Sequence, residues 1–286
     1  MVSASSHALV PTIAFIGGGN MAEAILGGLI MAGHPVNQLR YSEPLEVRRQ
    51  YMQSKYPDVM GEASNTLVME GADVIILAVK PQVLKIVVQD LAVAFQQKNP
   101  LVISIVAGIK TSDILDWINS SQPVALVRSM PNTPALIGEG AVGLYATDVV
   151  NEDQRQTTEK IMNAVAKKIT WVEQEGLIDT ITGVSGSGPA YFFLMMEAMQ
   201  SAGVAAGLTP EDSKNLTLQT CLGAAKMALE SEDDLATLRR KVTSPNGTTE
   251  AAIKSMEASD IRKLMHDAVF AATARSQELA EQMGKN

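Results

Sequence analysis

The sequence predicts an α/β protein in which a doubly wound sheet is followed by an all-helical C-terminal part. Short apolar runs, typical of strands, alternate with helical segments over the first part of the chain. These runs show no polar alternation, as expected of strands that are covered on both faces. After about residue 177 no convincing strand follows. We therefore expect two domains, residues 1–174 and 175–286, with residues 1–10 as a flexible tail.

A glycine-rich turn follows the first expected strand, residues 12–16, and opens the first expected helix, residues 21–31. Its spacing is G-x-G-x-x-A, carried by Gly17, Gly19 and Ala22. The first glycine allows a sharp turn, the second lets a pyrophosphate approach the backbone, and the small Ala22 lets the helix pack on the strand. Free N–H groups at the helix N-terminus attract phosphate. This unit predicts a Rossmann-type dinucleotide site rather than a bare tight turn.

The rest of the N-terminal domain repeats this alternation, which predicts right-handed βαβ units. Glycine and proline mark several boundaries, such as Gly33 after the first helix and Pro81 at the start of a later one. Further strands are expected over residues 38–42, 74–79, 101–105, 124–128, 140–145 and 169–172. Further helices are expected over residues 45–55, 65–71, 81–95, 111–117 and 152–165.

Four helices are expected in the C-terminal part, over residues 189–206, 210–230, 248–258 and 260–283. The first is apolar on almost every side, so it must be enclosed. Either the N-terminal domain or a second copy of the chain could enclose it. We favour a homodimer, because crossed apolar helices with small residues form self-complementary surfaces.

The composition limits the classes of partner. With a net charge of −8 and a pI near 5.0, neither nucleic acid nor a membrane is expected as a partner. No apolar run reaches the length of about 18 residues that a membrane span needs. The single cysteine, Cys221, fits a reducing cytoplasm and is expected to be a small buried residue on a helix. His7, His34 and His266 stand in no metal-ligand spacing, so no metal is expected.

Two further loops follow strands of the N-terminal domain, at the edge where ligands bind on such sheets. The segment 79–81, Val-Lys-Pro, could place Lys80 at a cofactor, or Lys80 could be a solvated lysine at a strand end. The segment 130–134, Met-Pro-Asn-Thr-Pro, offers hydrogen bonds from Asn132 and Thr133, or it could be a rigid surface turn.

Two segments of the helical part could bind a substrate. Residues 183–190, Gly-Val-Ser-Gly-Ser-Gly-Pro-Ala, are expected to be a small-residue loop that a ligand can approach closely. Residues 244–250, Ser-Pro-Asn-Gly-Thr-Thr-Glu, are expected to lead into a helix N-terminus rich in hydroxyl and free N–H groups, which suits a carboxylate. Ordinary N-capping by serine or threonine would explain the second segment equally well.

No G-x-S-x-G nucleophile elbow is present. The obvious loops offer no proton donor for the reduction of a carbonyl, and the helix after Pro189 carries no lysine. An imine needs less, because a protonated C=N bond is already electrophilic and positioning, a dry pocket and a hydroxyl or water can suffice. A hydroxyacid or sugar-acid dehydrogenase and a non-catalytic dinucleotide sensor are the alternatives.

Together these motifs resemble pyrroline-5-carboxylate reductase, the family that completes proline synthesis, over residues 11–280. The resemblance is carried by residues 15–22, 78–81, 130–134, 183–191 and 244–249. The family more often has Gly-Gly where Asn246 and Gly247 stand. The resemblance implies hydride transfer from NAD(P)H to the C=N bond of 1-pyrroline-5-carboxylate, a small cyclic imine, to give L-proline. It also implies that the helical domains of two subunits interlock, with rings of dimers in some members.

The resemblance and the fold together assign the candidate site residues. Thr249, with the N–H groups of Gly247 and Thr248, would hold the substrate carboxylate and the nitrogen side of the ring. The catalytic candidates are Thr249 and Ser244. The cofactor candidates are Gly17, Gly18, Gly19, Asn20, Met21, Ser42, Asn65, Val79, Lys80, Pro81, Asn132 and Thr133. The substrate candidates are Ser185, Gly186, Ser187, Gly188, Asn246, Gly247, Thr248 and Thr249.

The end of the second strand predicts which dinucleotide is used. In this fold the residue at that position meets the adenosine ribose, and a hydroxyl there accommodates a 2′-phosphate whereas a carboxylate repels it. Ser42 is expected at that position and Glu43 is expected to point away, because adjacent residues of a strand face opposite sides. Arg48 and Arg49 could then reach the phosphate. We therefore expect NADPH to be preferred over NADH, although a register error of one residue would reverse the preference.

Overall fold

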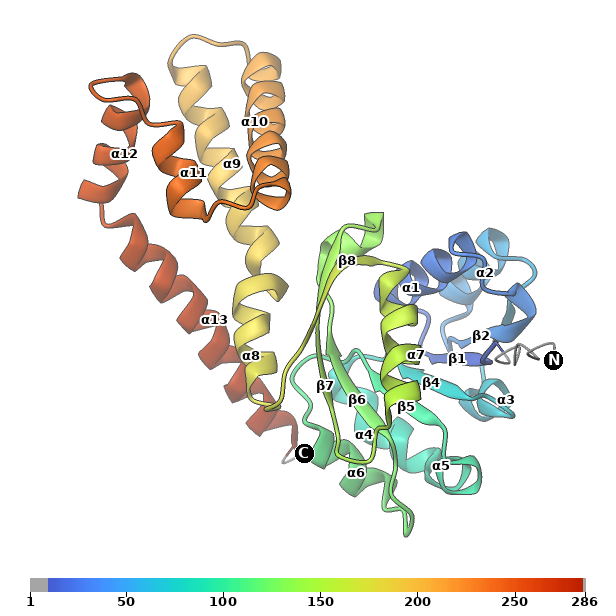
Figure 1. Cartoon of the computed structure of the whole chain (residues 1–286). Helices are drawn as coiled ribbons and strands as arrows, with labels where there is room; N and C mark the ends of the chain where they lie inside the picture. The colour runs from blue at the N-terminus through green and yellow to red at the C-terminus, as the bar shows by residue number, and fades with distance from the viewer. Residues whose placement is uncertain (1–9, 285–286) are drawn as a thin grey trace, which may run out of the picture. The chain divides into compact units, whose positions relative to one another are not determined.

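The computed structural model describes residues 10–284, and these residues contain an eight-stranded sheet with helices on both faces (Figure 1). Nearly all of the predicted tail, and His7 with it, falls outside the described residues. The strands are β1 (Ile13–Ile16), β2 (Leu39–Ser42), β3 (Met60–Glu62), β4 (Val74–Leu77), β5 (Leu101–Ser104), β6 (Leu126–Met130), β7 (Gly140–Ala146) and β8 (Ala166–Trp171).

The sheet has the strand order β3-β2-β1-β4-β5-β6-β7-β8. Every pair is parallel except β6 with β7, which is antiparallel. The chain winds outward from β1 to one edge through β2 and β3, and then to the other edge starting with β4. The carboxyl ends of β1 and β4 therefore border the crevice at which such sheets bind dinucleotides.

The helices alternate with these strands and then continue without strands. They are α1 (Asn20–Met31), α2 (Glu46–Lys55), α3 (Asn65–Met69), α4 (Pro81–Asp90), α5 (Ala92–Lys98), α6 (Thr111–Ile118), α7 (Glu152–Asn163), α8 (Leu177–Ile181), α9 (Gly188–Ala205), α10 (Pro210–Glu230), α11 (Leu235–Lys241), α12 (Thr248–Ala258) and α13 (Ile261–Gly284). Short 3₁₀ turns span Val36–Gln38 (η1) and Thr133–Ile137 (η2), and a π-helical turn spans Thr182–Gly186 (η3).

The sheet separates two apolar cores because its side chains alternate between the two faces. Ile13 and Phe15 of β1 lie in one core with residues of α1, α2 and α7, and Ala14 and Ile16 lie in the other with residues of α3, α4, α5 and α6. All four β1 side chains are fully buried. The predicted strand, buried on both faces, is confirmed, and its burial fixes the position of the turn that follows it.

Several elements differ from the sequence-based expectation. The strand β3 is not predicted because Met60–Glu62 contains no β-branched residue. The helix expected over residues 81–95 is two helices that meet at Leu91. The segment 183–190, expected to be a loop, is mostly helical and continues from α8 through η3 into α9. The short helix α11 is a further unpredicted element.

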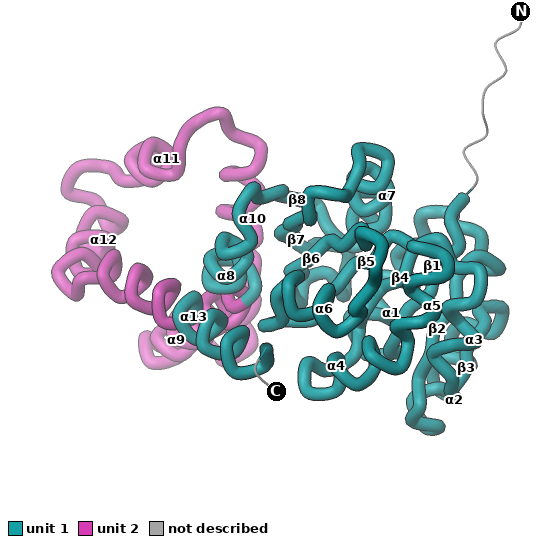
Figure 2. Tube along the Cα trace, turned by 90° about the horizontal axis from the view of Figure 1, so that it is seen from below, with its two compact units in different colours: residues 1–186, 272–286 teal, residues 187–271 magenta. Residues whose placement is uncertain are grey.

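The chain forms two compact units, which Figure 2 shows in teal and magenta. Unit 1 comprises residues 1–186 and 272–286, and unit 2 comprises residues 187–271. Residues 175–186 and the end of α13 therefore belong with the sheet. The compact units divide after Gly186, beyond α8 and η3, and the domain boundary at residues 174 and 175 stays a prediction.

Unit 2 exposes the apolar residues that a folded unit normally covers. No hydrophobic residue among residues 187–271 reaches the burial of the core residues of unit 1. On α9, Phe192, Phe193 and Leu194 are 59%, 64% and 67% exposed. Cys221, expected to be buried, is half-buried on α10. This amount of apolar surface is typical of a region that associates with another chain.

Candidate active site

The turn between β1 and α1 is built around Gly17. Its φ of +106° lies in the region that favours glycine. A Cβ added there would lie 2.8 Å from the carbonyl oxygen of Ala78, so the backbone after β4 leaves no space for a side chain. The position next to Gly19 is open, since a Cβ there would find its nearest neighbour, the Ala78 oxygen, at 4.0 Å. The turn therefore has no space for a side chain at Gly17, whereas the space at Gly19 is open to an approaching phosphate.

The N-terminus of α1 presents backbone N–H groups at this opening. Gly19 is its N-cap and makes no side-chain capping bond, and both Gly19 and Asn20 are exposed. The first turn of α1 is anchored, because Ala22 is 1% exposed in the core below the helix. Exposed, uncapped N–H groups at the positive end of a helix form an anion site. Met21, half-buried beside them, packs against the same core.

The loop after β4 lies directly beside this turn. The Ala78 N–H donates to the Ile16 carbonyl oxygen at 2.8 Å, which continues the pairing of the two strands beyond their ends. Lys80 is exposed and is the N-cap of α4, which Pro81 begins. The structure thus brings the 79–81 segment to the glycine turn. Asn65 is placed at the start of α3, where the Ser64 hydroxyl accepts the Leu67 N–H at 3.5 Å.

The end of β2 differs from the expectation. Ser42 is fully buried, and its hydroxyl lies between strands, where it accepts from the Gly17 N–H and donates to the Phe15 carbonyl, both at 3.4 Å. Glu43 lies beside the glycine turn instead, and its Oε2 accepts the Gly18 N–H at 3.2 Å. The strand ends at Ser42, yet the Glu43 N–H still donates to the Glu62 carbonyl at 2.8 Å, and both the Ser42 and the Glu43 side chains contact the glycine turn. Ser42 therefore has no exposed hydroxyl with which to make the predicted contact to the ribose.

Two arginines of α2 hold the same corner. The Arg48 Nε donates to the Gly18 carbonyl at 2.7 Å, and its guanidinium pairs with the Glu23 carboxylate at 2.6 Å. Arg49 donates to the Glu43 carbonyl at 2.7 Å. The two arginines thus donate to the backbone of the glycine turn and to that of the residue after β2.

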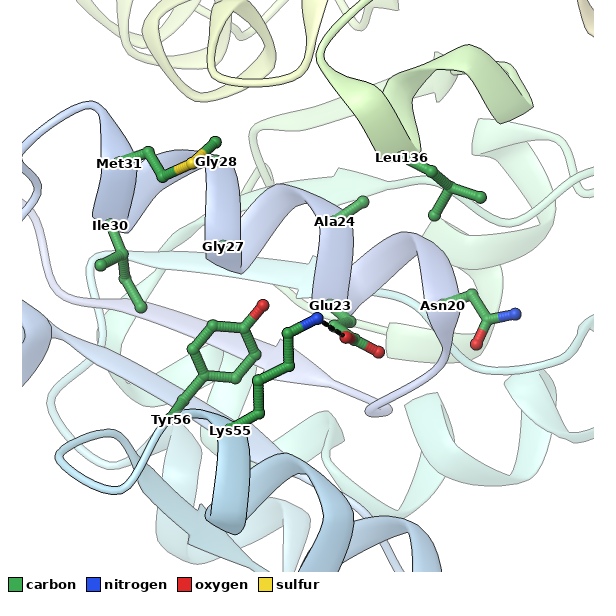
Figure 3. A pocket seen from close by; sticks show the side chains of 10 residues that line it. All are labelled: Asn20, Glu23, Ala24, Gly27, Gly28, Ile30, Met31, Lys55, Tyr56 and Leu136. Carbon is green, nitrogen blue, oxygen red and sulfur yellow. Dashed lines mark hydrogen bonds and ion pairs between the residues drawn. The ribbon is translucent and has the colours of Figure 1, made fainter.

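A cavity of about 450 Å³ runs along α1 from Asn20 to Met31 and is also lined by Lys55, Tyr56 and Leu136 (Figure 3). Lys55 pairs with Glu23 at its wall, at 2.5 Å. Burial alone would raise the pKa of the Glu23 carboxyl, but the bonds from Lys55, Arg48 and Tyr51 outweigh it and hold that pKa below its usual range. The carboxylate is therefore a fixed negative charge on the first turn of α1.

The segment after β6 is held from both sides by Asn132. The Asn132 Nδ2 donates to the Ser185 carbonyl at 3.1 Å, and its Oδ1 accepts the Ala141 N–H at 3.0 Å. Only 8% of Asn132 is exposed, whereas Thr133 is exposed. The side chain of Asn132 is thus committed to holding η2, β7 and η3 together.

The π turn η3 carries two of the predicted substrate residues. The Ser185 hydroxyl donates to the Ile181 carbonyl at 3.1 Å within the helix. A Cβ added at Gly186 would lie 2.8 Å from the Met130 methyl group, so the turn packs on the end of β6. π turns occur often at functional sites. The other two predicted residues, Ser187 and Gly188, begin unit 2 and α9.

The 244–250 segment forms the N-terminus of α12 in unit 2. Gly247 is the N-cap without a side-chain capping bond, so capping by serine or threonine is not observed there. Asn246 has a φ of +58°, which asparagine tolerates better than most residues and which explains how it can replace a glycine. The Gly247 N–H donates to the Ser244 carbonyl at 3.1 Å, and the Thr249 side chain is half-buried.

The Glu250 side chain accepts a hydrogen bond from one backbone N–H group of this segment. Its Oε2 accepts the Asn246 N–H at 2.9 Å, and this bond, followed by the pairing with Lys254, lowers the pKa of the Glu250 carboxyl. The N–H groups of the first turn of α12 have no side-chain cap among the described residues. The segment therefore presents uncapped backbone donors, and the binding of a carboxylate there stays a prediction.

One buried charged cluster is not predicted from the sequence. Arg128 on β6 pairs with Glu175 at 3.1 Å and with Asp179 at 3.4 Å, and the Ser276 hydroxyl donates to Asp179 at 2.7 Å. Thr111 donates its N–H and its hydroxyl to Glu175. The available indication was an arginine inside an apolar strand, which burial permits only when its charge is paired.

Residues 10–284 contain no group of three or more histidine, cysteine, aspartate or glutamate side chains placed to hold a metal ion. Within the same range, no helix is long and apolar enough to cross a membrane.

Comparisons with known proteins match both parts of the chain. Residues 12–108 match a family described as NADP oxidoreductase, coenzyme F420-dependent, and residues 175–279 match pyrroline-5-carboxylate reductase dimerisation. The pyrroline-5-carboxylate reductase of Pseudomonas aeruginosa is 49% identical over 96% of this chain and 99% of its own length. The enzyme of the same name from Arabidopsis thaliana is 37% identical over 94% of this chain and 95% of its own length.

Solved structures of the same name superpose closely. That of a pyrroline-5-carboxylate reductase from Coxiella burnetii has a TM-score of 0.89 and 42% identity, covering 95% of this chain and 99% of that one. That of Plasmodium falciparum pyrroline carboxylate reductase with NADP bound has a TM-score of 0.82 and 30% identity, covering 94% and 98%. With these likenesses extending over nearly the whole length of both chains, this chain belongs to the pyrroline-5-carboxylate reductase family.

Proposed function

We propose that this protein reduces 1-pyrroline-5-carboxylate to L-proline with NADPH as its preferred cofactor, the last step of proline biosynthesis. Besides family membership, one observation carries the proposal: the open glycine turn at Gly17–Asn20, with the exposed N-terminus of α1 beside the loop after β4. NADPH is supported by the NADP-oxidoreductase family that matches residues 12–108 and by the NADP in the Plasmodium falciparum relative. We include NADH as the second cofactor of this proposal.

Unit 1 fits a dinucleotide. The space at Gly19 and the uncapped N–H groups of α1 suit a pyrophosphate, and Lys80 supplies a positive charge at the next strand end. The remaining contacts are those assigned above to Gly18, Met21, Asn65, Val79, Pro81 and Thr133. Asn132 would act by holding the backbone of its segment, since its own side chain is bonded to Ser185 and Ala141.

Unit 2 supplies the proposed carboxylate site. The N–H groups of Gly247 and Thr248, with the Thr249 hydroxyl, would hold the substrate carboxylate at the positive end of α12. This contact selects a cyclic imine that carries a carboxylate. Ser185, Gly186, Ser187 and Gly188 would complete the binding of the substrate.

When bound, a reduced nicotinamide would supply the hydride that the imine carbon accepts. The chain's own task is to hold the imine as its protonated form and to keep it oriented, because a C=N⁺ bond accepts hydride without a further acid. Thr249, or a water that it orients, would contact the nitrogen, and Ser244 would support that contact. The hydride and the proton on nitrogen together account for the two hydrogens that distinguish proline from the imine.

The C-terminal region indicates a homo-oligomer, since residues 175–279 match a dimerisation family. We propose that the protein forms a homodimer through unit 2, whose apolar residues are exposed in the single chain. We extend this proposal to a ring of dimers and to a cytoplasmic location, which match the predicted biosynthetic role.

The test is a steady-state assay on the purified full-length protein. Reduced cofactor should be consumed only when 1-pyrroline-5-carboxylate is present, and L-proline should appear in equal amount by chromatography. In the reverse direction, proline at high pH should reduce the oxidised cofactor. Dinucleotide binding without any turnover would favour a sensor, and turnover of 2-hydroxy acids in place of proline would favour a dehydrogenase.

A further inference from the structure

We infer that Glu43 determines how strongly this protein discriminates between NADPH and NADH, by opposing the 2′-phosphate of NADPH. This inference rests on the proposed function only in that a nicotinamide dinucleotide is bound at the glycine turn. It concerns Glu43, which strand alternation in the sequence places on the side that points away from the ribose.

The Glu43 carboxylate is held at the glycine turn by two backbone donors. Its Oε2 accepts the Gly18 N–H at 3.2 Å and its Oε1 accepts the Leu45 N–H at 2.9 Å. The residue is 8% exposed, and a Cβ added at Gly18 would lie 3.1 Å from the Glu43 Cβ. The side chain is therefore fixed against the turn by contacts on both oxygens.

This position is where the adenosine ribose lies in a sheet of this kind. The dinucleotide crosses the glycine turn between the ends of β1 and β2, and a carboxylate at the end of the second strand accepts a hydrogen bond from the ribose 2′-hydroxyl. A 2′-phosphate at the same place would meet a like charge. Ser42 is unsuited to this contact because its side chain is fully buried between the strands.

The two arginines of α2 supply the opposing effect. Arg48 contacts the Gly18 carbonyl and Arg49 contacts the Glu43 carbonyl, so two positive charges lie in the same corner as the Glu43 carboxylate. A 2′-phosphate would gain from these cations and lose from the carboxylate. The balance predicts a protein that uses NADPH and also retains NADH, with Glu43 limiting the preference.

A structural explanation of Glu43 is that it orders the start of α2 through the Leu45 N–H and does no more. The substitution Glu43→Gln separates the two explanations, because the amide carbonyl can still accept one backbone N–H while the negative charge is lost. The structural explanation predicts equal changes for both cofactors. The specificity explanation predicts that NADPH binding tightens while NADH binding changes little.

The experiment measures dissociation constants of NADPH and NADH by nicotinamide fluorescence, without substrate, on the full chain. In Glu43→Gln we expect the affinity ratio to shift toward NADPH by about tenfold, an amount typical of removing one like charge from a partly buried contact. The matched control is Glu46→Gln, which removes the same charge from an exposed residue three positions away and should leave the ratio unchanged. Ser42→Ala should change the affinities for NADPH and NADH by the same factor, or should change neither.

An unchanged ratio in Glu43→Gln, or the same shift in Glu46→Gln, overturns the inference. So does a ratio that moves in Ser42→Ala and not in Glu43→Gln. Because these are binding measurements, they remain informative if the protein fails to reduce the imine. Failure of the proposed function would appear separately, as absent proline formation with both dinucleotides bound. Kinetic ratios of kcat/KM for the two cofactors should follow the binding ratio.

Discussion

Gly17 illustrates how one residue can serve both folding and ligand binding. Its positive φ and its contact with the loop after β4 are independent reasons for glycine. In Gly17→Ala we expect a loss of more than about 2 kcal/mol of unfolding free energy, since the backbone strain is joined by a clash with a carbonyl. Urea unfolding would measure this loss, and dinucleotide binding should fall with it.

The matched control for this substitution is Gly33→Ala. Gly33 has a φ of +87°, but nothing lies within 4 Å of an added Cβ. We therefore expect only the strain, about 1 kcal/mol, and unaltered dinucleotide binding. Equal losses in the two variants would show that the contact with Ala78 contributes nothing.

Thr249 tests the proposed carboxylate site. In Thr249→Val the shape is kept and the hydroxyl is lost, so kcat/KM for the imine should fall by about 100-fold, or roughly 2.7 kcal/mol. Cofactor affinity should not change. Thr248→Val is the comparison, because it keeps the backbone N–H proposed to bind the carboxylate and should cost much less. A loss of stability and cofactor affinity with no selective loss of kcat/KM would indicate a structural role for the hydroxyl.

At the scale of elements, the buried cluster around Arg128 joins β6, α6, α8 and the end of α13. Arg128 and Asp179 have side chains only 3% and 4% exposed. In Arg128→Met the buried Asp179 and the half-buried Glu175 lose their cationic partner, and we expect a loss of about 3–5 kcal/mol in unfolding free energy. Arg275→Met, at an exposed pair with Glu278, is the control and should cost less than about 1 kcal/mol. Similar small losses in both variants would contradict the assigned role of the cluster.

The contact between α1 and α2 predicts a pH dependence. The pKa of Glu23 is lowered in the folded chain from its ordinary value of 4.5, so its ionised form stabilises the fold. That contribution is complete above the ordinary value and disappears as the pH falls through the lowered one. The stability difference between wild type and Glu23→Gln, measured by urea unfolding, should therefore shrink between neutral pH and acid pH. A stability difference that is constant with pH would contradict a lowered pKa of Glu23 in the folded chain.

The elements also show how far the sequence could lead. The glycine turn, the apolar strands and the long C-terminal helices follow from local patterns, and the structure contains them. The exchange of Ser42 and Glu43 could not be predicted from strand alternation alone, because the Ser42 hydroxyl is bonded to the backbone of Phe15 and Gly17 while the Glu43 carboxylate reaches the Gly18 N–H. The π turn and the cluster around Arg128 depend on contacts between distant segments, such as Asn132 with Ser185, which no local pattern records.

For the whole molecule, the apolar surface of unit 2 predicts that a single chain is not the stable form. Light scattering at micromolar concentration should give a dimer or a multiple of it. In Phe193→Glu a charge is placed on α9 at a residue that is 64% exposed in the single chain, and we expect dissociation or loss of folding. Val93→Glu, on α5 at 65% exposure, should leave the assembly unchanged. A well-behaved wild-type monomer would contradict the proposed dimer.

The end of α13 has a consequence for synthesis. Ser276 bonds to the buried Asp179, Ala280 is 1% exposed, and a Cβ at Gly108 would lie 3.5 Å from Leu279, so residues near the end of the chain complete the packing of unit 1. A ribosome makes the sheet early and these residues late. Unit 2 is therefore translated while the nascent sheet still lacks the residues of α13 that cover it. A chaperone that binds apolar surface would act on the chain during this interval.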